Sequence, residues 1–194
     1  MSSAALSDLR VLDLTRVRAG PTCCRILADF GADVIKVENP GFPDGARQTK
    51  KGDLISPGFA AGHRNKRSLA IDLRSEQGRE LMLSLARKAD VVLSNFKPGT
   101  MESLGLGHAD LLVANPRLAL VESSAFGSRG PWSERGGYGP LVRAAAGLTY
   151  LWRYDDDPLG FSDALTVYPD HAAGRMSAIA ALSMLIRRAR TGAP

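Results

Sequence analysis

The chain has 194 residues, of which 44% are hydrophobic and 23% are charged, a composition that excludes a disordered chain and leaves room for a buried core. No run approaches the roughly 18 consecutive apolar residues of a membrane span, so we expect a soluble protein with no membrane partner. The net charge of +5 favours anionic partners without identifying them.

The first third of the chain predicts one strand–helix–strand unit. Apolar, β-branched runs at residues 10–14 and 33–38 are expected to be strands, with a helix at 22–30 between them. The connection is long enough for a right-handed crossover between parallel strands. Residues 39–65 carry too many glycines and prolines for a long regular element, so we expect an ordered excursion with a short helix.

The middle of the chain repeats this alternation. Further strands are expected at 68–73, 90–96 and 117–123, with helical segments between them, the first capped by Ser75. Alternating strands and helices predict a mainly parallel sheet flanked by helices. The expected fold class is therefore α/β and Rossmann-like.

Helices dominate the last third. Residues 141–151 are expected to be helical, and an alanine-rich run at 170–190 predicts a long helix that ends in arginines, where cations complement the helix dipole. These arginines lack interleaved aromatic residues, and the other basic residues are scattered. We therefore expect no nucleic-acid partner.

Several common kinds of site are absent from the sequence. Neither GxGxxG nor GxxxxGK[ST] occurs, which argues against a dinucleotide fingerprint and a P-loop. His63, His108 and His171 accompany neither a GxSxG elbow nor an HExxH pattern, so a hydrolase triad and a metal site lack support. Cys23 and Cys24 are adjacent, which speaks against a disulfide framework and favours buried thiols.

Three candidates for chemistry remain, each with a plainer alternative. Asp170 opens the last helix, where it is either an ionised nucleophile or a helix cap. The basic stretch at 64–67 is either a phosphate site or a solvated turn. Residues 95–99 follow a predicted parallel strand, where they either bind a ligand or form a turn.

The order of four segments is familiar. LSDLRVLDLTRVRAGPTCCRILADFGADVIKVENPG is followed by RNKRSLAIDL, ADVVLSNFKPG and PRLALVESSAFGSRGPW. This series closely resembles the family III CoA-transferases, which include formyl-CoA transferase, carnitine CoA-transferase and α-methylacyl-CoA racemase. The resemblance covers essentially the whole chain, residues 1–194, as a single α/β CoA-binding domain, but only the N-terminal half of a usual member.

The resemblance implies a mechanism and a site. Asp170 in YPDHAAG matches the family's nucleophile, which attacks an acyl-CoA thioester to give a mixed anhydride and then an aspartyl-CoA thioester. An acceptor carboxylate finally takes over the CoA, and no metal takes part. The positions that resemble the family's CoA-binding residues are Arg16, Val17, Arg18, Ala19, Asn65, Lys66, Arg67, Asn95, Phe96, Lys97 and Tyr138.

Two departures from the family pattern bear on the substrate and the reaction. Arg18 stands where formyl-CoA transferase has a glutamine, which favours an acyl group that carries a carboxylate. Tyr138 stands where the racemases carry a catalytic histidine, and a tyrosine of pKa about 10 is a poor base near neutral pH. Transfer between an acyl-CoA and a carboxylic acid is therefore preferred, with a 2-methylacyl-CoA racemase as the alternative.

The missing half carries its own expectation. Family members are interlocked dimers whose large domain is completed by the C-terminal part of the chain. We therefore expect dimerisation and a second polypeptide that supplies the missing half. A non-catalytic CoA-binding or scaffold subunit is the remaining alternative. The N-terminus shows no secretory signal, so a cytoplasmic location is expected.

Overall fold

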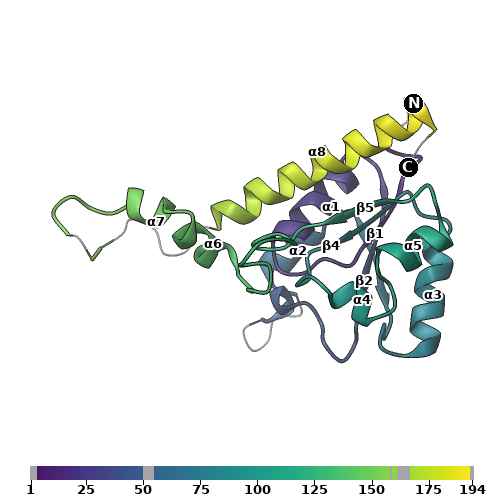
Figure 1. The fold of residues 1–194 in the computed structure, drawn as a ribbon, viewed down its shortest axis with the longest axis horizontal. Coiled ribbons are helices and arrows are strands. Elements are labelled where there is room, and N and C mark those ends of the chain that lie inside the picture. The colour runs from purple at the N-terminus through teal and green to yellow at the C-terminus, as the bar shows by residue number, and fades with distance from the viewer. Residues whose placement is uncertain (1–3, 50–54, 158, 161–166, 193–194) are drawn as a thin grey trace.

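The structure, a computed structural model, describes residues 4–49, 55–157, 159–160 and 167–192 (Figure 1). Five parallel strands form one sheet in the order β3-β2-β1-β4-β5. The strands are β1 (Arg10–Asp13), β2 (Asp33–Glu38), β3 (Lys66–Ala70), β4 (Val91–Ser94) and β5 (Ala119–Glu122). The expected parallel α/β sheet is therefore confirmed.

Helices connect these strands or follow the last of them. They are α1 (Ala19–Asp29), the 3-10 turn η1 (Gly45–Arg47), α2 (Pro57–His63), α3 (Glu76–Ala86), α4 (Thr100–Ser103), α5 (His108–Ala114), α6 (Gly139–Ala145), α7 (Leu148–Leu151) and α8 (Tyr168–Thr191). Ser75 caps α3 as expected, because its hydroxyl accepts the Gly78 N–H at 3.0 Å. Within the described part of the chain, no helix is long and apolar enough to cross a bilayer.

The order of the strands creates a switch point at the centre of the sheet. The chain moves from β1 outward to β2 and β3, then crosses back to add β4 and β5 on the other side of β1. The connections that leave the carboxyl ends of β1 and β4 therefore diverge. In open α/β sheets this crevice is the usual place for a ligand.

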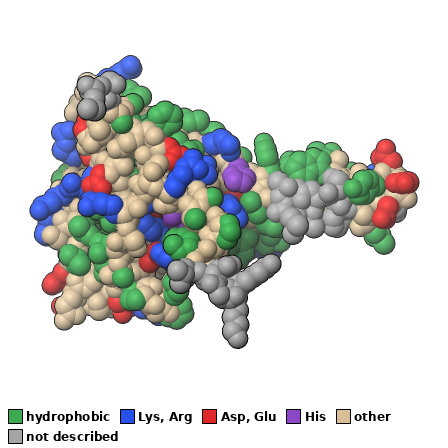
Figure 2. All heavy atoms as spheres, turned by 180° about the vertical axis from the view of Figure 1, so that it is seen from behind, with side chains coloured by type: hydrophobic (Ala, Val, Ile, Leu, Met, Phe, Trp, Pro, Cys, Tyr) green, Lys and Arg blue, Asp and Glu red, His purple; other side chains and the backbone are tan. Residues whose placement is uncertain are grey.

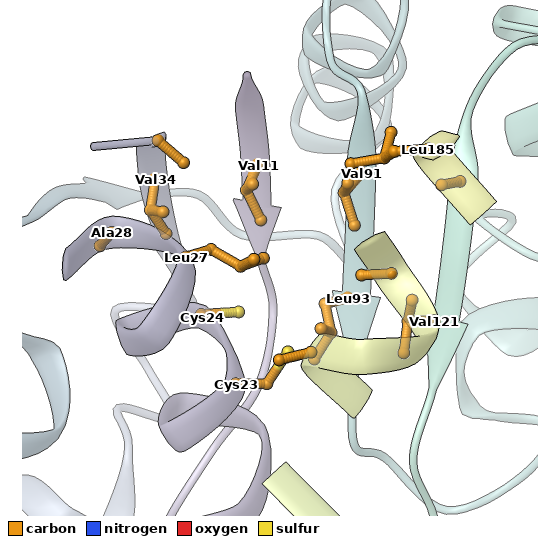
Figure 3. Packing of buried hydrophobic residues seen from close by; sticks show 14 residues of the cluster. Val11, Cys23, Cys24, Leu27, Ala28, Val34, Val91, Leu93, Val121 and Leu185 are labelled. Carbon is orange, nitrogen blue, oxygen red and sulfur yellow. The ribbon is translucent and has the colours of Figure 1, made fainter. Parts of the chain in front are cut away.

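Both faces of the sheet are covered, as a parallel sheet requires. Helices α1 and α8 pack on one face, where Val11, Leu27, Val34, Leu93 and Leu185 belong to one buried cluster (Figure 3). Cys23 and Cys24 lie in the same cluster as buried free thiols, as expected. The segment from α3 to α5 covers the other face, where a second cluster includes Leu12, Met82 and Leu111.

A glycine sets the distance between α1 and α8. A Cβ atom at Gly174 would lie 2.6 Å from the Ala19 carbonyl oxygen and 2.7 Å from the Thr22 Cβ, so the two helices touch at backbone distance. Gly174 is one turn after Asp170 on α8, and Ala19 is the first residue of α1. This contact therefore brings Asp170 to the start of α1.

Two expected elements differ from the structure. Strand β3 is shifted towards the N-terminus of the expected 68–73 and stops at Ala70, because its partner β2 ends at Glu38. The apolar residues beyond it, Ile71 and Leu73, are buried outside the strand, although the Ile71 N–H still donates to the Glu38 carbonyl at 2.8 Å. The expected helix at 141–151 is broken into α6 and α7 by Gly147, which has a left-handed φ of 77°.

Candidate functional site

A cavity of about 370 Å³ lies at the carboxyl ends of β1, β4 and β5, against the start of α8. Eight of the residues expected at the site line it together, namely Arg16, Val17, Ala19, Asn95, Phe96, Lys97, Tyr138 and Asp170. Segments that follow three different strands thus converge on the switch point of the sheet. This is where the topology predicts a ligand.

The sequence analysis missed the other lining residues, which are Gly45, Ser123, Ser124, Ala125, Gly137, Gly139, Val142, Pro169 and Ala173. The three residues at 123–125 follow β5 directly, so the rule that placed residues 95–99 at the ligand edge would have placed them there too. No signal of that kind marks the glycines. Their contribution depends on how α6 approaches α8.

Asp170 occupies the third position of α8 and is half-buried. The N-cap of this helix is Val167, which makes no side-chain capping bond, so the alternative of Asp170 as the helix cap is wrong. Burial raises the pKa of Asp170, against the opposing effects of its own backbone N–H, of His171 and Arg18, and of the Ala19 N–H. A carboxylate at a helix start facing a cavity is chemically suited to act as a nucleophile.

One oxygen of this carboxylate lacks a partner. Asp170 Oδ2 is buried and accepts no hydrogen bond within the part of the chain that the structure describes. An unsatisfied buried acceptor is costly, and such atoms are concentrated where function requires them. A Cβ atom at Gly139 would collide with Oδ2, so the carboxylate occupies space that this glycine leaves free.

The loop that joins β1 to α1 is fixed from the side of β4. The Asn95 amide accepts the Arg16 N–H at 2.7 Å and donates to the Arg16 carbonyl at 2.8 Å. Asn95 thereby binds the loop backbone as a neighbouring strand would. Asn95 lines the cavity, where a ligand contact was expected, but its side-chain amide is hydrogen-bonded to the protein backbone.

Four of the residues expected to bind CoA do not line the cavity, namely Arg18, Asn65, Lys66 and Arg67. Arg18 is exposed at the start of α1, close enough for its charge to affect Asp170. Asn65 donates to Asp29 at 2.9 Å, and Arg67 forms a two-bond pair with Asp33 at 2.8 Å. The structure therefore does not bring Asn65, Lys66 and Arg67 into this cavity.

Lys66 is part of a buried ring of charged and polar side chains. Its side chain is 2% exposed, and its Nζ lies 2.8 Å from Asp13 Oδ2 and 3.2 Å from His63 Nδ1. His63 Nε2 lies 3.7 Å from Asp44 Oδ2, and Lys36 Nζ lies 3.6 Å from the same oxygen. Two carboxylates, two ammonium groups and one imidazole thus form a chain of contacts. Thr15 closes this chain, because it donates to Asp13 and its carbonyl accepts from Lys36. We refer to Asp13, Lys36, Asp44, His63 and Lys66 as the buried ring.

The ring is electrically neutral when the imidazole is neutral. Burial alone would raise the pKa of Asp13, but the charges of Lys66 and Lys36 outweigh it and lower this pKa to about 2. Burial and the charge of Lys66 lower the pKa of His63 to about 4. At neutral pH two negative and two positive charges therefore balance around an uncharged histidine. Such balance is what makes buried charges tolerable.

His63 predicts a pH dependence of stability. The unfolded chain takes up a proton on this imidazole near pH 6.5, whereas the folded chain does so only near pH 4. The free energy of unfolding should therefore fall by on the order of 2 kcal/mol between about pH 6.5 and pH 5, above the range in which carboxylates titrate. Urea unfolding measures this slope. His63→Gln should flatten it, and an equal slope in both chains would contradict the assignment.

Comparison with known proteins decides the family. The family model of CoA-transferase family III matches residues 6–193. The chain belongs to CoA-transferase family III. It is 50% identical over 189 residues to "Probable CoA-transferase Rv1866" of Mycobacterium tuberculosis, covering 95% of this chain and 24% of that protein. It is 36% identical to the "Succinyl-CoA--L-malate CoA-transferase alpha subunit" of Chloroflexus aurantiacus, covering 96% of this chain and 44% of that subunit.

Solved structures agree with this family III assignment. The crystal structure of a CAIB/BAIF family protein from Brucella suis matches with a TM-score of 0.88 at 37% identity, over 99% of this chain and 52% of that chain. The family III chain described here thus spans about half the length of that structure, and half or less of these relatives. The expected resemblance to an N-terminal half is confirmed.

Proposed function

We propose that this chain is the CoA-binding, nucleophile-bearing part of a CoA-transferase that moves CoA from an acyl-CoA to a carboxylic acid through Asp170. The observation that carries the proposal is the buried, unpartnered Oδ2 of Asp170 in a cavity at the switch point of the sheet. Family membership supplies the substrate class, an acyl-CoA thioester. The names of the relatives are those of transferases, which favours transfer over racemisation.

The proposed chemistry needs only the carboxylate and the substrates. An oxygen of Asp170 attacks the thioester carbonyl and the C–S bond breaks. The CoA thiolate departs, and a mixed anhydride of Asp170 and the donor acid is formed. The thiolate then attacks the aspartyl carbonyl, which releases the donor acid and forms an aspartyl-CoA thioester. The acceptor carboxylate attacks that carbonyl and expels the thiolate, which gives a second mixed anhydride between Asp170 and the acceptor. The thiolate then attacks the acceptor's carbonyl carbon in this anhydride. Acceptor acyl-CoA leaves and Asp170 is regenerated.

The proposed CoA contacts are those in the cavity wall. Arg16 and Lys97 place cationic side chains there, which suit phosphate groups. Lys97 is half exposed and pairs with the more exposed Glu134 at 3.2 Å, a surface pair that a phosphate can replace at little cost. Tyr138 is 71% exposed at the rim of the same wall.

Arg18 bears on the acyl group. It is an exposed cation beside the proposed nucleophile, outside the cavity wall. A cation there favours a substrate with a second carboxylate. Several relatives carry succinyl-CoA in their names, including a "Succinyl-CoA:glutarate CoA-transferase" of Mus musculus that is 36% identical. We therefore propose a dicarboxylic donor or acceptor.

A second polypeptide is proposed to complete the enzyme, in a dimeric assembly. Figure 2 shows hydrophobic side chains along the arm formed by α6 and α7, with acidic side chains at its far end. Leu141, Tyr150, Leu151, Tyr154 and Leu159 in this region are each more than half exposed, as are Met176, Ile179 and Ile186 along α8. Apolar surface of this extent marks an interface. The missing half of the family length is the proposed occupant.

Covalent trapping tests the proposal. The tagged chain is purified from its native cells with whatever accompanies it, and native mass spectrometry establishes the composition. This preparation is incubated with succinyl-CoA and quenched with hydroxylamine, which converts an aspartyl thioester or anhydride to a hydroxamate. We expect a second chain in fixed ratio and a hydroxamate at Asp170. A hydroxamate on the partner chain alone would support the scaffold alternative, and CoA exchange without any hydroxamate would refute covalent catalysis.

A further inference from the structure

The buried ring touches the loop that carries Arg18 and Ala19. Both oxygens of the Asp44 carboxylate accept the Val17 N–H, Oδ1 at 3.0 Å and Oδ2 at 3.1 Å. Oδ1 also accepts the Ala46 N–H at 2.9 Å, which caps η1. The Asp44 side chain is fully buried. Its contacts therefore join the loop after β1 to the segment after β2.

Val17 has a backbone conformation that needs such support. Its φ is 68°, in the left-handed region, which a β-branched residue adopts only under constraint from its surroundings. The next two residues are Arg18, whose charge acts on Asp170, and Ala19, whose N–H acts on the same carboxylate. Val17, Ala19 and Asp170 line one cavity. A Val17 that relaxed to an ordinary φ would turn both groups away.

We propose that Asp44 is a positioning residue for the nucleophile: it holds Val17 in the left-handed conformation and so directs Arg18 and the Ala19 N–H towards Asp170. The inference rests on the proposed function, because it assigns Asp44 a part in the same site. Asp44 itself touches neither Asp170 nor the reacting atoms. It acts through the backbone of one loop.

The charges around Asp44 fix its carboxylate in place. Lys36 from β2 and His63 from α2 approach Oδ2 at 3.6 Å and 3.7 Å, while Lys36 also donates to the Thr15 carbonyl at the end of β1. Asn95 fixes the preceding residue, Arg16, from the side of β4. Val17 is thereby held by Asp44 directly after an anchored neighbour, Arg16, and the ring explains why a charged residue is buried at this place.

Rescue by glycine distinguishes positioning from simple stabilisation. Asp44→Ala should lower kcat for CoA transfer at least about 30-fold in the complete enzyme, because the Val17 N–H loses its acceptor and the loop relaxes. Adding Val17→Gly should recover at least tenfold of that loss, since glycine adopts a positive φ without strain. Arg188→Met is the control for a loss of stability alone. Arg188 is 13% exposed and pairs with Asp90 at 2.6 Å near the end of α8, far along that helix from Asp170, so its loss should lower the melting temperature while kcat stays within about threefold.

Three results would overturn the proposal: no rescue by Val17→Gly, equal slowing by Arg188→Met, or an Asp44→Ala enzyme as fast as the wild type. Amide hydrogen exchange at Val17 provides a readout that does not depend on catalysis. The Val17 amide should be protected in the unmodified protein, and an unprotected amide would refute the role of Asp44 even if Asp44→Ala does not fold. A protected amide in an enzyme without transfer would refute the proposed function instead.

Discussion

Replacing Asp170 with asparagine should lower CoA transfer at least about 10³-fold without disturbing the fold, because an amide cannot form the anhydride or the aspartyl-CoA thioester. Steady-state transfer from succinyl-CoA to a dicarboxylic acceptor measures the rate, and circular dichroism checks the fold. The shape of the side chain is conserved in this substitution. The loss therefore reports on the nucleophile and not on packing.

The same substitution should leave stability unchanged or increase it. Burial raises the pKa of Asp170 in the folded chain, so folding disfavours the ionised carboxylate at neutral pH. Asparagine removes this penalty. Because a carboxyl group with a raised folded pKa is protonated more readily in the folded than in the unfolded state, the penalty in the wild type disappears on acidification. The difference in melting temperature between the two chains should thus narrow as the pH falls towards about 4.

Asp8→Asn is the matched control for this experiment. Asp8 is exposed just before β1 and lies outside both the cavity wall and the arm, so its loss of charge should leave transfer and stability unchanged. If Asp170→Asn retained transfer within tenfold of the wild type, the nucleophile would lie elsewhere. If it unfolded the chain, the carboxylate would be a structural element and not a strained functional one.

The sheet could be predicted because each strand is a short apolar run and the chain alternates strands with helices. The ends of the strands are harder to predict from the sequence, because they depend on the neighbouring strand. Strand β3 stops where β2 stops, although the apolar pattern continues to Leu73. Gly147 separates α6 from α7, although the residues around it have the apolar pattern of one continuous helix. Local sequence thus predicts which segments are regular, and pairing sets their limits.

The site divides along the same line. Residues that follow β1 and β4 could be placed at the ligand edge from topology alone, and they line the cavity with Asp170. Asp44 and Gly139 could not be found in this way, because their roles depend on one backbone N–H and on one close approach between helices. The basic stretch at 64–67 was expected at the ligand site but does not line the cavity, because the sequence shows its charge and not the direction in which each side chain points.

Lys66 and Arg67 separate these two kinds of basic residue. Lys66→Met should lower the free energy of unfolding by about 3–5 kcal/mol, because it leaves Asp13 as a buried carboxylate without its closest counter-charge. Arg67→Met is the matched control on the neighbouring residue. The Arg67 side chain is 65% exposed and pairs with Asp33 at the surface, so its loss should cost at most about 1 kcal/mol.

Urea unfolding of both variants, followed by CoA titration, decides what the ammonium of Lys66 does. A buried structural cation predicts a large loss of stability for Lys66→Met alone, with CoA affinity unchanged in whatever fraction remains folded. A phosphate ligand, as the family resemblance implies for this position, predicts equal stability for both variants and weaker CoA binding for Lys66→Met. The 2.8 Å contact with Asp13 favours the first outcome, since an ammonium that turned outward to a phosphate would leave that carboxylate buried and uncompensated.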